Sequence, residues 1–198
     1  MRPKKPKVCK VCKAPFVPAL PMQKVCSPAC ALSLAKSQRA QEQKRAQLLA
    51  RRQERQADKQ RREALKTRSE WMREAQAAFN RYIRLRDAGK PCICCGLPLG
   101  EGDVGGRYDA GHYRSVGSAP QCRFDERNCH GQRKQCNRYG AGRAVDYRLG
   151  LIDRIGLAQV EALEADQTPR KWTAAELRQI RDTYRAKARA LEKEAASV

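Results

Sequence analysis

Apolar and polar residues follow two different helical patterns in the first half of the chain. Between Ala31 and Ala88 there is neither glycine nor proline, and residues of good helix propensity dominate, which predicts one long helix or two consecutive ones. Residues 38–66 are polar nearly all round, so a helix there buries little. A second pattern starts at Trp71, and Gly89 offers a C-terminal stop. Its apolar residues recur at helical spacing and predict packing on the domain that follows: Trp71, Ala75, Ala78, Phe79, Tyr82 and Ile83.

The second half changes pattern twice. Residues 90–143 are rich in glycine, cysteine and turn residues, with short apolar pieces at 91–93 and 107–109, which predicts a small metal-stapled unit with brief strands. Helical spacing returns from Ala144, with Gly156 as a candidate break. A last helix is predicted after Thr173, because Thr173 and Glu176 form a capping box and Trp172 can pack on Leu177.

These patterns predict an α+β fold that is mostly helical. A small zinc-stapled core with brief strands is flanked by helices and preceded by a zinc finger and a long basic helix. The predicted parts are a finger at 1–30, a basic helical linker at 31–68, a core with flanking helices at 69–165, and a C-terminal helix at 166–198.

Charge adds a partner to this picture. The 198 residues carry a formal net charge of +21, and residues 1–30 hold seven basic and no acidic residues, while residues 31–90 hold seventeen and seven. Such an excess favours a polyanion, since each phosphate neutralised by Lys or Arg releases counterions. We therefore expect the N-terminal half to bind nucleic acid. The alternative for residues 31–68 is a solvated helix with no binding role.

Membrane insertion and secretion are not expected. No stretch approaches the roughly 20 apolar residues of a membrane span, and no signal-peptide core follows Met1. The ten cysteines are then expected in a reducing cytoplasm, where they bind metal rather than form disulfides.

The first cysteine group has zinc-finger spacing. Cys9 and Cys12 are separated by two residues and Cys26 and Cys30 by three, so four thiolates can surround Zn²⁺ in a closed structural site. Thirty residues build no apolar core, so the metal would supply the folding energy.

The second group combines a zinc knuckle with candidate catalytic residues. Cys92 and Cys95 precede His112, and Asn128 and the pair Cys136–Asn137 follow. This order resembles the HNH nuclease motif in its His-Asn-Asn form, which implies a core of the ββα-metal (HNH-like) type. In that arrangement His112 is the general base that deprotonates water, Asn128 orients its imidazole, and Asn137 ligates Mg²⁺ or Mn²⁺.

Two residues could provide the second ligand of the catalytic metal. Many HNH sites carry an acid or a histidine just before the base, where this chain has Gly111. Asp109 or His130 must serve instead, and Asp109 is preferred. His130 could equally act as a zinc ligand or support a neighbouring ligand.

Most of the chain resembles the NinG (Rap) recombination proteins of lambdoid bacteriophages. The resemblance rests on the first cysteine group and on residues 75–84, 86–87, 91–96, 109–113, 123–124, 128–132, 136–137 and 146–148. It implies a metal-dependent endonuclease that resolves Holliday junctions and D-loops, in the cytoplasm of a bacterial host and encoded by a phage or prophage. A two-fold junction also suggests a homodimer, and host or phage recombination proteins are further candidate partners.

One departure from the family pattern concerns zinc. Arg133 stands where the first cysteine of a second pair is expected, so Cys92, Cys95 and Cys136 lack a partner. Cys129 is the hypothesised fourth ligand, with Cys122 and Cys94 in reserve.

Two rival functions remain. A non-catalytic zinc protein could hold branched DNA for host enzymes, and an RNA-binding zinc protein would also suit the basic helix. The trio His112, Asn128 and Asn137 favours the nuclease, because a pure binding protein has no need of it.

Overall fold

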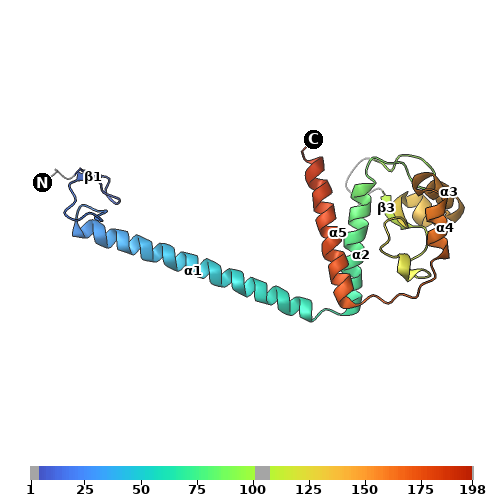
Figure 1. The fold of residues 1–198 in the computed structure, drawn as a ribbon, viewed down its shortest axis with the longest axis horizontal. Coiled ribbons are helices and arrows are strands. Elements are labelled where there is room, and N and C mark those ends of the chain that lie inside the picture. Colours follow the sequence, from blue (N-terminus) through green and yellow to red (C-terminus); the bar gives the residue numbers. More distant parts are fainter. Residues whose placement is uncertain (1–4, 101–107, 198) are drawn as a thin grey trace. The chain divides into compact units, whose positions relative to one another are not determined.

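The computed structural model describes residues 5–100 and 108–197. The chain divides into two compact units, residues 1–65 and residues 66–198 (Figure 1).

The first unit consists of a two-stranded ribbon followed by a long helix. Strand β1 (Lys7–Val8) pairs antiparallel with β2 (Pro15–Phe16). Helix α1 (Pro28–Ala64) has 37 residues and contains no buried residue. Its N-cap is Ser27, whose hydroxyl accepts a hydrogen bond from the backbone N–H of Cys30 at 3.3 Å. The predicted long helix that buries little is confirmed, and it starts inside the predicted finger.

A second helix follows after a short break. Helix α2 (Arg68–Arg86) begins at a capping box in which Thr67 and Glu70 bond each other's backbone N–H groups. The chain therefore forms two consecutive helices, and the break falls at a polar capping signal rather than at glycine or proline.

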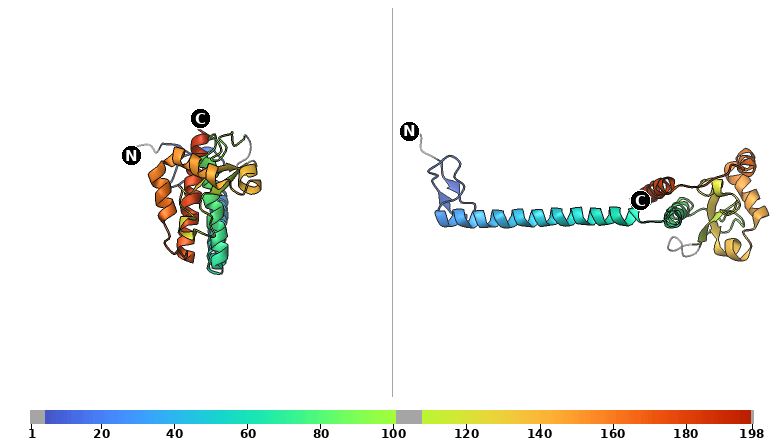
Figure 2. Two further views of the ribbon diagram at one scale, coloured as in Figure 1. Left: turned by 90° about the vertical axis from the view of Figure 1, so that its right-hand side faces the viewer. Right: turned by 90° about the horizontal axis from the view of Figure 1, so that it is seen from below.

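Helix α2 packs against α5 (Ala174–Ala195), and the two lie side by side in Figures 1 and 2. The predicted apolar stripe of α2 is buried there, and the capping box of Thr173 and Glu176 starts α5 as predicted. The cluster joins both helices to the region between them: Trp71, Ala75, Ala78, Phe79, Ile83, Phe124, Cys129, Leu177 and Tyr184.

A β-hairpin lies between α2 and the two helices formed by residues 144–165 (Figure 1). Strand β3 (Tyr108–His112) pairs antiparallel with β4 (Cys129–Arg133), so that His112 lies opposite Cys129 and Gly111 opposite His130. The connection contains a 3₁₀ turn, η1 (Pro120–Cys122), and β4 runs into a π-helical turn, η2 (Gln135–Tyr139). The order is therefore strand, strand, helical turn.

Two short helices complete the second unit. Helix α3 (Ala144–Ile155) and helix α4 (Leu157–Ala165) are separated at Gly156, whose φ of 86° confirms the predicted break. They bury a second cluster composed of Ile93, Ala119, Cys122, Tyr147, Leu151, Val160 and Leu163.

The mostly helical α+β class is confirmed, with two small two-stranded sheets among the described residues. Details differ from expectation around the knuckle. Residues 91–93 form no strand, since Pro91 makes only an isolated bridge to Pro98, and Arg107 lies outside the described residues. None of the helices that the structure describes has both the length and the apolar composition of a bilayer-crossing segment.

Candidate functional site

The first cysteine group forms in the first unit. The sulfur atoms of Cys9, Cys12, Cys26 and Cys30 all lie within 4.8 Å of one another. Cys12 Sγ lies 3.5 Å from Cys26 Sγ, which lies 3.7 Å from Cys30 Sγ. Four sulfurs about 2.3 Å from a tetrahedral zinc would be separated by roughly 3.8 Å, so this set of donors fits Zn²⁺.

The second group has three members instead of four. Cys92, Cys95 and Cys136 bring their sulfur atoms within 4.8 Å of one another. Cys129 does not join them, which corrects the predicted ligand set. Its place on β4 directs its sulfur into the core, 3.6 Å from Nδ1 of His112, and the residue is fully buried.

The two reserve cysteines are not part of this set of three: Cys94 packs beside it and its thiol contacts that of Cys92, while Cys122 lies elsewhere. Cys94 Sγ accepts a hydrogen bond from Gln132 Nε2 at 2.8 Å, and Cys122 is buried in the second apolar cluster. Three thiols can hold Zn²⁺ and leave its fourth position to another ligand.

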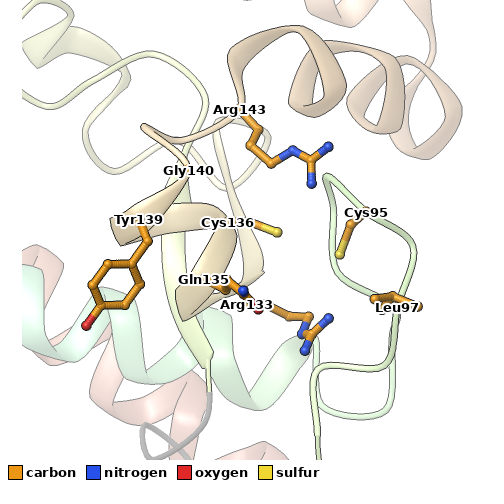
Figure 3. A pocket seen from close by; sticks show the side chains of 8 residues that line it. All are labelled: Cys95, Leu97, Arg133, Gln135, Cys136, Tyr139, Gly140 and Arg143. Atoms are coloured by element: carbon orange, nitrogen blue, oxygen red, sulfur yellow. The ribbon is translucent and has the colours of Figure 1, made fainter.

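A hollow of about 580 Å³ adjoins the three-cysteine group (Figure 3). Arg133 and Arg143 extend their guanidinium groups into the space between η2 and the knuckle, beside Cys95 and Cys136 (Figure 3). Residues from three segments line it: Cys95, Leu97, Arg133, Gln135, Cys136, Tyr139, Gly140 and Arg143.

The structure brings together Asp109 and Asn137, the two predicted ligands of the catalytic metal. Asn137 Nδ2 donates to Asp109 Oδ2 at 3.0 Å, joining strand β3 to the turn η2. Arg138 also donates to both carboxylate oxygens, at 2.8 and 3.0 Å. Burial alone would raise the pKa of Asp109, but the hydrogen bonds from Arg138 and Asn137 outweigh it and lower that pKa. Asp109 is therefore a carboxylate at neutral pH.

His112 lies on the α2 side of the hairpin. Its ring stacks at 5.9 Å from the ring of Phe79, and Nε2 lies 3.0 Å from the carbonyl oxygen of Arg123. Because a carbonyl only accepts, Nε2 carries the proton and Nδ1 is the basic nitrogen. Burial lowers the pKa of His112, so the imidazole is neutral at pH 7.

Asn128 does not contact this imidazole, which corrects its predicted role. Its side chain accepts from the backbone N–H of Arg114 at 2.8 Å and donates to the carbonyl oxygens of Arg114 and Cys122, both at 3.0 Å. The residue is fully buried and ties the connection between the strands. The carbonyl of Arg123, next to Cys122, holds the imidazole instead.

Asp109 and His112 point to opposite faces of the hairpin. Successive strand side chains alternate between faces, and the two residues are three positions apart. Gly111, on the face of Asp109, has a local reason to be glycine. A side chain there would collide with Gln132, which is itself fixed by hydrogen bonds to Cys94 and Gly142.

His130 takes part in a buried charge network that the sequence patterns did not single out. Its Nε2 lies 3.1 Å from the carbonyl oxygen of Arg127, and its Nδ1 lies 3.1 Å from Arg86 Nη2. Burial lowers the pKa of His130 as well. His130 therefore bonds to Arg86 and to the backbone of Arg127, and supports the hairpin.

The centre of that network is Asp87, the C-cap of α2, which is completely buried. Its carboxylate accepts from Arg86 at 2.9 Å on each oxygen and from the backbone N–H of Gly131 at 2.8 Å. Burial alone would raise the pKa of Asp87, but hydrogen bonds from His130 and Arg86 hold it well below the usual range. Only the Arg86–Asp87 pair within the family resemblance pointed to this position.

Similarity to known proteins extends over nearly the whole chain. The family profile described as Bacteriophage Lambda NinG protein matches residues 1–194, which span both units.

The chain belongs to the NinG family.

Curated NinG relatives come from several phages. The chain is 42% identical to protein ninG of Salmonella phage P22 over 179 residues, which cover 87% of the chain and 86% of that relative. It is 40% identical to protein ninG of Escherichia phage lambda, covering 87% and 85%. The identity to protein ninG of Escherichia phage 933W is 45% over 124 residues, covering 63% and 59%. No solved structure matches the chain.

Proposed function

We propose that the chain is a metal-dependent DNA endonuclease that acts on branched recombination intermediates such as Holliday junctions and D-loops. The observation that carries the proposal is the pairing of Asp109 with Asn137 at 3.0 Å, next to a three-thiol zinc-compatible group. The strand–strand–helical turn order agrees with the ββα-metal arrangement. The branched substrate comes from the resemblance to NinG proteins alone.

The candidate cation site uses hard oxygen donors. The Asp109 carboxylate and the side-chain oxygen of Asn137 would hold Mg²⁺ or Mn²⁺, which would stabilise charge on the cleaved phosphodiester. Two local movements are needed. Asn137 presents its amide nitrogen to Asp109, so the amide must turn over, and Arg138 must release the carboxylate. The side chain of Arg138 is 57% exposed and can move to a DNA phosphate.

The candidate base has the right protonation state. The bond from His112 Nε2 to the Arg123 carbonyl fixes the tautomer and leaves Nδ1 to accept a proton from water. Asn128 acts one step away, because it holds the Cys122 carbonyl and so the backbone beside Arg123. It is a positioning residue in this scheme.

The remaining parts have supporting roles in the proposal. Zn²⁺ in the two cysteine groups shapes the finger and the knuckle, and the basic helix α1 contacts DNA. We place the activity in the bacterial cytoplasm, with a homodimer on two-fold junctions and recombination proteins as further partners.

One observation favours a second candidate, a non-catalytic protein that holds branched DNA. Asp109 and His112 lie on opposite faces of the hairpin, and Cys129 occupies the Nδ1 side of His112 at 3.6 Å. A working centre would need DNA binding to open a water path around the end of β3.

Cleavage of an end-labelled four-way junction, beside a linear duplex of the same sequence, separates the two candidates. With Mg²⁺ or Mn²⁺ the nuclease proposal expects cuts in the junction. His112→Ala and Asp109→Asn should each reduce the cutting rate by about 10²–10⁴-fold while junction binding is kept. Arg189→Gln, at an exposed position of α5, serves as the control. Tight binding without cutting under either metal supports the holding protein instead.

A further inference from the structure

The hollow beside the three-cysteine group has the chemistry of an anion site. No carboxylate is among the eight residues that line it. Two guanidinium groups enter it from different segments, Arg133 from the end of β4 and Arg143 from the start of α3 (Figure 3). Guanidinium groups present several N–H donors in a planar fork that matches phosphate oxygens.

Arg143 is held in place by an unusual loop. Ala141, Gly142 and Arg143 all have left-handed backbone conformations, with φ of 50°, 77° and 48°. For residues other than glycine this conformation costs energy, and such strain persists where the surroundings enforce it. Here Gly142 N–H donates to the Cys136 carbonyl at 3.2 Å, and Gln132 Nε2 donates to the Gly142 carbonyl at 3.0 Å.

The side chain of Arg143 is also oriented. Its Nε donates to Asp146 Oδ2 at 2.7 Å, and it contacts the Cys136 thiol. Asp146 does not line the hollow. The strained loop thus aims a guanidinium at the space above the thiols and leaves its outer donors available.

Arg133 has donors to spare. Its backbone N–H lies 3.3 Å from Cys92 Sγ, which fixes where the side chain starts. Within residues 5–100 and 108–197 its guanidinium makes no hydrogen bond or ion pair. Neutralising the cysteine group alone would need only one arginine. Zn²⁺ with three thiolates carries one net negative charge, and Arg143 already contacts a thiol.

We infer that this hollow binds a phosphodiester group of the DNA backbone between Arg133 and Arg143. The inference rests on the proposed function, since it requires that the chain binds DNA. It places that contact next to the candidate cation ligands. In η2, Cys136 lines the hollow while the next residue, Asn137, bonds Asp109. The hollow and the Asp109–Asn137 pair are thus connected through adjacent residues of η2.

The test measures the binding of a fluorescent four-way junction to the full-length, zinc-loaded chain over a range of salt concentrations. Arg133→Gln removes one charge, and Arg143→Asn removes the other with a residue that tolerates the left-handed conformation. Each should raise Kd about fivefold near 0.15 M salt and lower the slope of log K against log salt by about 0.9. Arg133→Lys should keep most of the slope, and the control Arg189→Gln should change neither value.

Several results would overturn the inference. If the unaltered chain binds tightly and both variants keep its Kd and slope, the hollow does not contact DNA. The proposed function would still stand. A loss of affinity that accompanies loss of zinc would assign the arginines to the metal centre. Displacement of DNA by low-millimolar inorganic phosphate at constant ionic strength would assign the hollow to free phosphate. No junction binding by the unaltered chain would overturn both proposals.

Discussion

The two cysteine groups lie in very different surroundings. Among residues 5–30 only Cys9 and Pro18 are buried, so the first group has almost no apolar core around it. The second group lies in a unit with three buried apolar clusters, one of which includes Cys92 and Cys136 themselves. The same ligand type therefore serves two purposes. We expect metal at the first group to create the fold, and metal at the second to add to a fold that packing already supports. This difference is consistent with three thiols in the second group and four in the first.

The largest expected effect comes from breaking the first group. Cys26→Ser should lower the zinc content by about one ion per chain and unfold residues 5–30, because apparent zinc binding energies of such modules are about 10–16 kcal/mol. Zinc analysis and NMR spectra check this. Cys122→Ala, at a buried cysteine outside both groups, is the control. An unchanged zinc content in Cys26→Ser would contradict the comparison.

The second unit should instead lose stability when its buried charge at Asp87 is removed. Asp87→Asn leaves Arg86 without its carboxylate partner, and breaking such a buried pair typically costs about 3–5 kcal/mol. Thermal unfolding should show a large loss for the second unit, with the zinc content of the finger unchanged. Loss of both units together would show that they do not fold independently.

The same substitution predicts a pH dependence. The pKa of Asp87 is lowered in the folded chain, so its contribution is fully present above the unfolded pKa of about 3.9 and is lost as the pH falls below that value. The difference in stability between the unaltered chain and Asp87→Asn should therefore shrink on acidification. A difference that stays constant from neutral pH down to about pH 3 would show that Asp87 acts without its charge.

Helix α1 offers a test of what the first unit contributes to binding. Lys44, Arg51, Arg55, Lys59 and Arg62 are exposed and follow one another at helical spacing, so they form a basic stripe along one face. Replacing Arg51 and Arg55 together by Gln should weaken junction binding by about 25-fold near 0.15 M salt, at roughly fivefold per phosphate contact. Salt-dependent binding assays check it, and an unchanged slope would mark α1 as a solvated spacer.

The smallest expected effect comes from adding a fourth cysteine to the second group. Arg133→Cys adds a fourth cysteine that forms a pair with Cys136. We expect metal to bind this group at least about tenfold more tightly, which corresponds to about 1.4 kcal/mol. Competition with a coloured chelator measures the affinity. Cys129→Ala should leave the zinc content unchanged, because that thiol faces His112.

Local sequence signals predicted the helices well. The stripe from Trp71 to Ile83, the capping box at Thr173 and the break at Gly156 were all readable, since each depends on neighbours within a turn or two. The break between α1 and α2 is also encoded in the sequence, in the Thr67–Glu70 capping box, although neither glycine nor proline marks it.

The candidate site was harder to predict because it depends on strand register. Sequence spacing gathered Cys92, Cys95 and Cys136 and paired Asp109 with Asn137. It did not show that β4 turns Cys129 toward His112, or that Asn128 bonds the backbone of its own connection. A shift of one residue along a strand changes the face, and no local pattern fixed the register here.

Helix α1 extends about 55 Å if its 37 residues rise 1.5 Å each, and none of them is buried. Its stability is therefore constrained by composition rather than by any neighbour in a core. Exposed substitutions that keep helix propensity should be nearly neutral for folding, and whole turns can be added or removed without opening a cavity. Packing therefore leaves the length of α1 unconstrained, while α2, with the same backbone geometry, is held to the length and spacing of its buried contacts.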